Sequence, residues 1–155
     1  MGNLEDVIEV VASASTKLTK GTNLFAHFLP ETNLGGGYAS TALPTVAVSE
    51  VPGLPAVDRF VGASGGLPAF NRPQFEVVVR STQGTAGVAD PRPARGLTDN
   101  IYRAILSHAP NTTASTSGRR LTLGAIPPSM VERDARGRFV FLIPVDSWSD
   151  FSTST

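Results

Sequence analysis

Apolar residues recur every three or four positions at the start of the chain. Five of them fall on one stripe of a helix: Leu4, Val7, Ile8, Val11 and Leu18. Asn3 suits the N-cap position, and Gly21 suits the left-handed position that follows a helix. The pattern therefore predicts an amphipathic helix over residues 4–20.

Further along, apolar and polar residues alternate with the period of two that is typical of strands. The predicted strands cover residues 23–30, 45–50, 75–80, 121–125, 129–133 and 139–145. The strand at 75–80 is largely apolar on both faces, which predicts a place at the centre of the sheet. The polar turn 134–137 joins the last two strands into an antiparallel hairpin.

A second amphipathic helix is predicted between the third and fourth strands. Its apolar stripe consists of Ile101, Tyr102, Ile105, Leu106 and Ala109, and Pro110 ends it. Asp90 and Pro91 resemble an N-cap followed by a proline in the first helical position. Since Gly96 costs about 1 kcal/mol relative to alanine inside a helix, Thr98 is an alternative start. The order of elements predicts a single α+β domain, in which two helices cover one face of a mainly antiparallel sheet of about five strands.

Glycine, proline, serine and threonine concentrate in the connections. The predicted loops cover residues 31–43, 54–73 and 81–90, and residues 149–155 are expected to form a mobile tail. Long loops within a small domain often carry function.

Composition narrows the classes of function. The chain has 155 residues, which fits one domain, and its 13 basic and 13 acidic residues give a net charge of zero. Bulk electrostatic binding of nucleic acid is therefore disfavoured. Without cysteine the chain can form neither disulfides nor thiolate metal sites. The acidic start and the lack of a run of about 18 apolar residues predict a soluble protein made in the cytoplasm.

Residues 62–66 match the G-x-S-x-G pattern of serine hydrolases, with Ser64 as the nucleophile. That pattern requires a helix after the serine, and Leu67-Pro68 opposes one. The two histidines, His27 and His108, lack partners at metal-ligand spacing. The glycine run 35–37 lacks the Gly-Lys-Ser/Thr end of a phosphate loop. We expect no catalytic residue, no metal and no cofactor, and we expect that the protein is not an enzyme.

Arginines form the only dense basic features. Arg119 and Arg120 are adjacent, and Arg133, Arg136 and Arg138 surround the hairpin turn. These side chains either bind DNA phosphates or an acidic subunit, or they protect the hairpin edge from unwanted strand pairing.

Several segments resemble the tail terminator or minor capsid family of long-tailed bacteriophages. They are residues 44–53, 72–81, 90–106, 126–128 and 132–139, and the similarity in segment order extends over about residues 4–147. The loop 31–43 and the sequence Pro91-Arg92-Pro93 have no counterpart in the family pattern.

The resemblance implies a virion protein at the head–tail junction, made in the host cytoplasm. Such a subunit assembles into a hexameric ring that stops tail tube polymerisation, contacts the tail tube protein and the head-closure protein, and lets double-stranded DNA pass without reading its sequence. The interface candidates are Arg59, Phe60, Phe70, Arg72, Asp134 and Arg136. The candidates for contacts with DNA in the lumen are Arg119, Arg120 and Arg138.

Three alternatives remain at this point. A head-closure or adaptor subunit of the same connector would share the ring logic. A small serine hydrolase would use Ser64, and a monomeric binding domain would need no assembly at all.

Overall fold

The computed structural model describes residues 3–30, 44–52, 70–82, 90–108, 121–134 and 137–150. Within these residues the elements are α1 (Asn3–Ser13), β1 (Leu24–Ala26), β2 (Thr45–Val51), β3 (Phe70–Asn71), β4 (Gln74–Arg80), α2 (Arg92–Ser107), β5 (Leu121–Ala125), β6 (Ser129–Arg133) and β7 (Phe139–Asp150). The predicted α+β class is confirmed, and the described sheet has seven strands where about five were expected.

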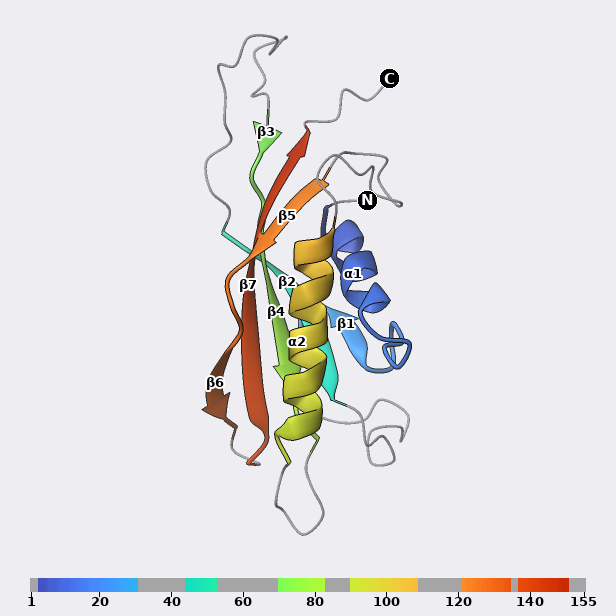
Figure 1. Cartoon of the computed structure of the whole chain (residues 1–155), viewed down its shortest axis with the longest axis vertical. Coiled ribbons are helices and arrows are strands. Elements are labelled where there is room, and N and C mark those ends of the chain that lie inside the picture. The colour runs from blue at the N-terminus through green and yellow to red at the C-terminus, as the bar shows by residue number, and fades with distance from the viewer. Residues whose placement is uncertain are drawn as a thin grey trace.

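The long strand β7 organises the sheet. One of its edges pairs with β4 and then β3, while the other pairs with β6 and then β5, all antiparallel. On the far side of β4 follow β2 and β1, and β1–β2 is the one parallel pair among the described strands. The strand at 74–80 therefore lies inside the sheet, as its apolar sequence predicts. Both helices lie in front of the strands on the same face (Figure 1).

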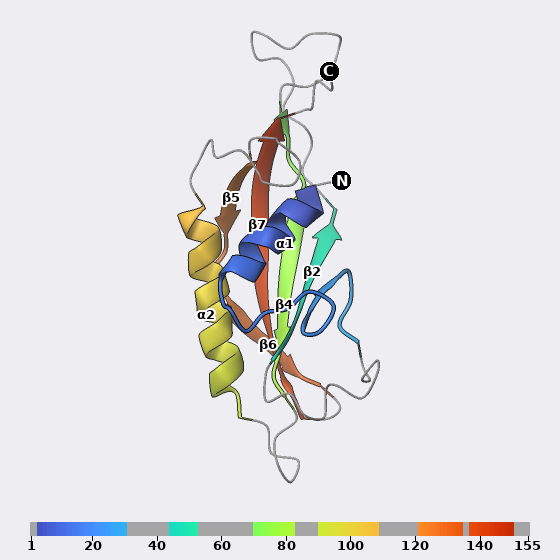
Figure 2. The ribbon, with the colours of Figure 1, turned by 90° about the vertical axis from the view of Figure 1, so that its right-hand side faces the viewer.

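The core fills the space between the helices and this face of the sheet (Figure 2). Its strand residues include Val46, Val48, Phe75, Val77, Val79, Phe141, Ile143 and Val145, and its helix residues include Leu4, Val7, Ile8, Val11, Ala94, Ile101 and Ile105. The odd-numbered residues of β4 and β7 point to the helices because successive side chains of a strand alternate between faces. Each buried aliphatic side chain contributes roughly 1.5–3 kcal/mol relative to exposure.

The first helix is shorter than the predicted span of 4–20, because it ends at Ser13. The hydroxyl of Ser13 donates to the Val10 carbonyl at 2.6 Å, and the hydroxyl of Ser15 accepts from the Lys17 N–H at 3.2 Å. Such local side-chain bonds compete with helix continuation. Gly21 does take a left-handed conformation, with φ of 78°, but in a separate turn after the helix.

The predicted strand 23–30 is reduced to β1, which covers Leu24–Ala26. His27 ends it with a φ of 73°, a conformation outside the range of an extended strand. Asn23 occupies the preceding turn, where its side-chain oxygen accepts from the Thr19 N–H at 2.7 Å. The end of this strand is therefore set by the backbone conformation of His27, which the mostly apolar sequence 24–29 does not reveal.

The second helix begins one residue later than the Asp90-Pro91 signal predicts, because Pro91 is the N-cap and Arg92 is the first helical residue. The Asp90 carboxylate accepts a hydrogen bond from the Arg92 N–H at 3.0 Å and others from the Arg92 guanidinium. This contact lowers the pKa of the Asp90 carboxyl and raises the pKa of Arg92. The alternative start at Thr98 is wrong, since Thr98 is buried within α2 and donates to the Ala94 carbonyl at 2.7 Å.

The last strand is longer than expected. It continues to Asp150, so residues 149 and 150, which were predicted to belong to a mobile tail, pair instead with Leu121 and with Phe70–Asn71. Strand pairing satisfies the backbone of this serine-rich segment, which has little apolar pattern of its own. The predicted hairpin of β6 and β7 is confirmed.

Candidate interaction surfaces

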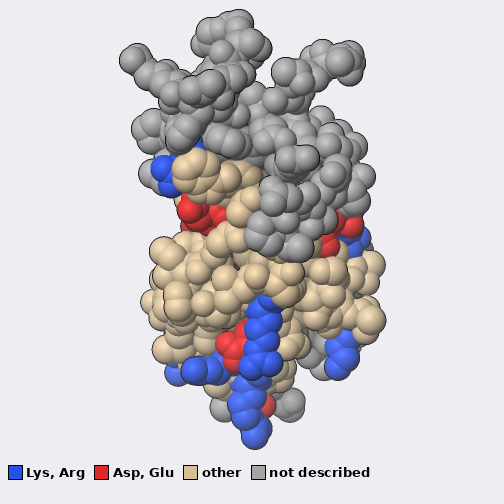
Figure 3. Space-filling model, turned by 45° about the horizontal axis from the view of Figure 1, so that its top comes forward, with Lys and Arg blue, Asp and Glu red and all other residues tan. Residues whose placement is uncertain are grey.

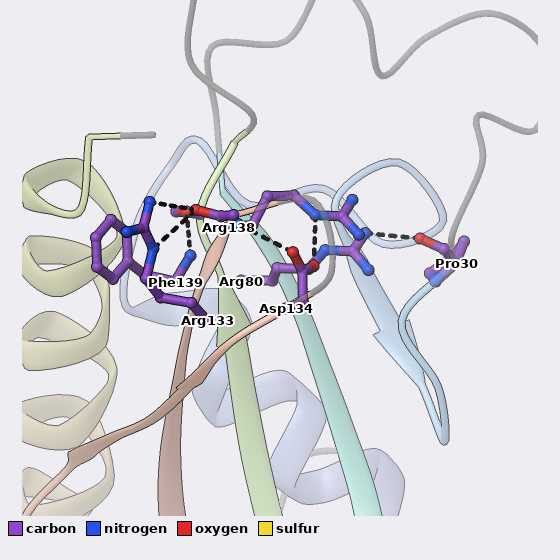
Figure 4. A network of polar contacts seen from close by, with 8 residues as sticks. Pro30, Arg80, Arg133, Asp134, Arg138 and Phe139 are labelled. Carbon is purple, nitrogen blue, oxygen red and sulfur yellow. Dashed lines mark hydrogen bonds and ion pairs between the residues drawn. The ribbon is translucent and has the colours of Figure 1, made fainter. Parts of the chain in front are cut away.

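The hairpin turn is held by an ion pair between Asp134 and Arg138. The Asp134 carboxylate accepts from the Arg138 N–H at 2.9 Å and from Arg138 Nε at 2.6 Å (Figure 4). Backbone bonds support it, because the Asp134 N–H donates to the Arg138 carbonyl at 2.9 Å. Gly137 has a φ of 74°, which glycine adopts at no steric cost. Several contacts within residues 134–138 therefore fix the conformation of the turn.

Arg138 does not suit its predicted role as a DNA contact. Only 7% of the residue is exposed, and its guanidinium is engaged by Asp134. A buried guanidinium of this kind could reach a phosphate only if the turn opened, which would leave the carboxylate without its cation. We therefore remove Arg138 from the residues expected to face DNA. A contact of Asp134 with a neighbouring subunit stays a prediction.

Two other arginines near the turn also have internal partners. Arg80 is 6% exposed, and its Nη2 donates to the Pro30 carbonyl at 2.6 Å (Figure 4). Arg133 lies over the Phe139 ring at 4.8 Å and donates to the Gly137 carbonyl. Arginine is suited to such sites because its planar fork stacks on rings and serves several acceptors. The described arginines around this turn therefore have partners within the chain itself.

Arg72 lies beside Trp148 and Asp146. Its guanidinium is 4.4 Å from the centre of the Trp148 ring, and Nη2 is 4.0 Å from Asp146 Oδ1. The same carboxylate oxygen accepts from Gln74 Nε2 at 2.5 Å. Since Val145 points into the core, Asp146 and Trp148 belong to the alternate set of β7 side chains, which points away from the helices. Arg72 is thus held in a defined position, partly exposed, and its role in an interface stays a prediction.

The outer edge formed by β5 and β6 carries exposed apolar side chains. We call Ile126, Met130 and Val131 the apolar edge; they are 62%, 55% and 55% exposed. Among the described strands, β5 and β6 each pair with β7 alone. A strand that pairs on one side leaves backbone donors and acceptors on the other side open to a further strand. The register shift between Met130 and Glu132 and the prolines at 127 and 128 interrupt this edge.

The sequence predicts the strand 129–133, but the site candidates did not include the residues of the apolar edge. Two neighbouring apolar residues, Met130 and Val131, cannot both point into a core from a regular strand. That pair could therefore have indicated an exposed apolar residue on this strand. Whether the strand is covered depends on the neighbours of β6, which the sequence does not show.

Several predicted features lie outside the described residues. These are Arg59, Phe60, Ser64, Arg119, Arg120 and Arg136, together with the loop 31–43 and most of the loops 54–73 and 81–90. Of Phe70, only the place of its backbone in β3 is described. Of the predicted site residues, the structure thus shows Asp134 paired with Arg138 and, separately, Arg72 beside Trp148 and Asp146. The other candidates stay predictions.

Within the described ranges, no group of three or more histidine, aspartate or glutamate residues is arranged to hold a metal ion. Among the described helices, none has the length and apolar character needed to cross a membrane.

Comparison with known proteins assigns no family. No protein-family model matches the chain, and no curated protein matches its sequence significantly.

Proposed function

We propose that this chain is a structural virion subunit, a tail terminator that assembles into a ring at the head-proximal end of a phage tail. The ring would cap the tail tube, stop its polymerisation and join it to the head connector. The apolar edge is the observation that best supports assembly into a ring. The resemblance in segment order supplies the phage context and the expected six-fold symmetry.

The apolar edge suits association because it combines two kinds of unsatisfied group. Ile126, Met130 and Val131 still expose more than half of their surface, so burying each would contribute roughly 1 kcal/mol. The backbone of β6 can also add a strand from a neighbour. Those contributions are small for one subunit, and closing a ring multiplies them over every interface.

A ring of identical subunits needs two different complementary patches on each subunit. The apolar edge would supply one of them. Arg72 is a candidate for the second, since a guanidinium stacked on Trp148 keeps its position and spends little conformational entropy on binding. Arginine and tryptophan are also the residue types that most often dominate interface energy.

The test compares two equally exposed apolar residues. Met130 is 55% exposed on β6 and Leu106 is 51% exposed on α2. Met130→Glu should convert rings to monomers at micromolar concentration, because a carboxylate would be buried at the interface. Leu106→Glu should leave the rings intact. Light scattering gives the mass, and negative-stain images show the symmetry.

Two results would contradict the proposal. If the wild-type protein stayed monomeric at every concentration, the proposal of a ring would be wrong. If the two variants behaved alike, the apolar edge would not be part of the ring interface. A head-closure subunit would also form rings, so the two connector roles are separated by binding to purified tail tubes or to purified heads.

A further inference from the structure

The solvent face of α2 carries a row of arginines. We call Arg92, Arg95 and Arg103 the arginine stripe; all three are exposed, and Asp99 lies between the last two. The intervals of three and eight residues place them on one side of the helix. The opposite side contains the buried residues Ala94, Thr98, Ile101 and Ile105. A narrow column of basic atoms, with acidic atoms beside it, runs along the part of the surface where α2 lies (Figure 3).

Two members of the stripe have guanidinium groups that no carboxylate of the described residues holds. The ion pairs described for this helix join Arg92 to Asp90 at 3.0 Å and involve neither Arg95 nor Arg103. This distinguishes the stripe from Arg80, Arg133 and Arg138, whose partners are internal. Because Arg95 and Arg103 are exposed, they can bind an anion without any change in the fold.

The length of the stripe bears on the kind of anion. Arg92 and Arg103 are eleven residues apart, which is about 17 Å along a helix. B-DNA has a rise of about 3.4 Å per phosphate on each strand, so the stripe spans roughly five phosphates. Arginine binds phosphate oxygens through its fork of N–H donors, and such contacts carry no base sequence information.

The acid within the stripe limits its affinity. Asp99 reduces the local positive charge, and the chain as a whole has a net charge of zero. A site built for tight retention of DNA would lack this acid. Weak contacts that are independent of sequence suit a duplex that must slide past a surface.

We infer that the arginine stripe of α2 binds the phosphates of double-stranded DNA without reading its sequence. That this surface faces the passing duplex inside a ring rests on the proposed function, whereas the binding itself does not. The sequence predicts DNA contacts at Arg119, Arg120 and Arg138, and the stripe consists of other residues.

The test measures fluorescence anisotropy of a labelled 24-base-pair duplex of mixed sequence, in potassium chloride from 25 to 200 mM. Arg95→Ala/Arg103→Ala should weaken binding at least fivefold at the lowest salt. It should also reduce the slope of log affinity against log salt by about 2, since each lost phosphate contact contributes about 0.9. Asp99→Asn should tighten binding by about twofold and leave the slope unchanged or steeper.

The control for net charge is Lys17→Ala/Lys20→Ala, which removes the same charge from exposed residues after α1, where Lys20 is paired with Glu9. It should retain most of the wild-type affinity. Equal losses in the two double variants would show that net charge alone matters and would overturn the inference. Absence of salt-dependent binding by the wild type would overturn it too.

A second arm distinguishes phosphates from protein carboxylates. Unlabelled poly-L-glutamate and unlabelled duplex compete for the labelled duplex at equal total charge. Stronger competition by the duplex is expected, and equal competition would mean that the stripe binds an acidic protein surface instead. Light scattering on the same samples separates the two proposals. If the protein forms rings that do not bind the duplex, only the inference of DNA binding by the stripe is wrong. If it stays monomeric and binds the duplex through the stripe, only the proposal of a ring is wrong.

Discussion

Asp134 and Arg138 show how tertiary context changes the role of charged side chains. In the sequence they belong to a charged turn that looked suited to external partners. In the fold they form one largely buried pair, with 19% and 9% of their side chains exposed. A guanidinium at such a site stabilises the fold only while its carboxylate is present, because removing one partner leaves an uncompensated charge.

Asp134→Ala should therefore lower the free energy of unfolding by about 2 to 4 kcal/mol, measured by urea titration. The control is Glu132→Ala on the exposed strand β6, which should change stability by no more than about 0.5 kcal/mol. If both variants unfolded at the same urea concentration, the pair would have no structural role.

At the scale of elements, α2 combines a buried apolar side with an exposed arginine side, and one of its residues does not favour a helix. Gly96 lies in the exposed interior of α2, and a Cβ added there would meet nothing within 4 Å. Glycine at this position lowers the stability of the helix because it loses more backbone freedom on folding. Its presence explains why the sequence left the start of α2 open.

Gly96→Ala should raise the free energy of unfolding by about 0.5 to 1 kcal/mol, and the melting temperature by about 1 to 4 °C. Gly21→Ala is the matched comparison, since that site also has open space around a Cβ but has a φ of 78°. There alanine should cost about 1 kcal/mol, because a Cβ disfavours the left-handed conformation. Melting curves of the two variants that shifted in the same direction would contradict this reasoning.

At the scale of the whole molecule, the helices cover one face of the sheet and the strands β5 and β6 border it. The described core is one cluster that joins both helices to β2, β4 and β7. The apolar edge and the arginine stripe therefore belong to one folded unit. A neighbouring subunit that covered the apolar edge would leave the fold of that unit unchanged and would stabilise it by mass action.

If the subunits associate through the apolar edge, the melting temperature of the wild type should rise with protein concentration. A hundredfold increase in concentration should shift it by several degrees, and Met130→Glu should abolish the shift. Differential scanning calorimetry across that range measures both. A melting temperature that is constant for the wild type would mean that no folded oligomer forms under these conditions.

The residue pattern by itself determined the α+β class, the central apolar strand β4, the buried side of α2 and the hairpin of β6 and β7. These features follow from periodicity and turn chemistry, which act within a few residues and are therefore visible along the chain. Arg95 and Arg103, which pair with no carboxylate of the described residues, are also evident in the sequence, but they form a row only once the helix arranges them.

Tertiary structure decided the rest. The extension of β7 to Asp150, the burial of Arg138 and the exposure of Met130 all depend on which segments become neighbours. A serine-rich segment becomes a strand when β5 and β3 supply its hydrogen bonds. Such outcomes depend on contacts between distant parts of the chain, so the sequence pattern, which is local, could not specify them.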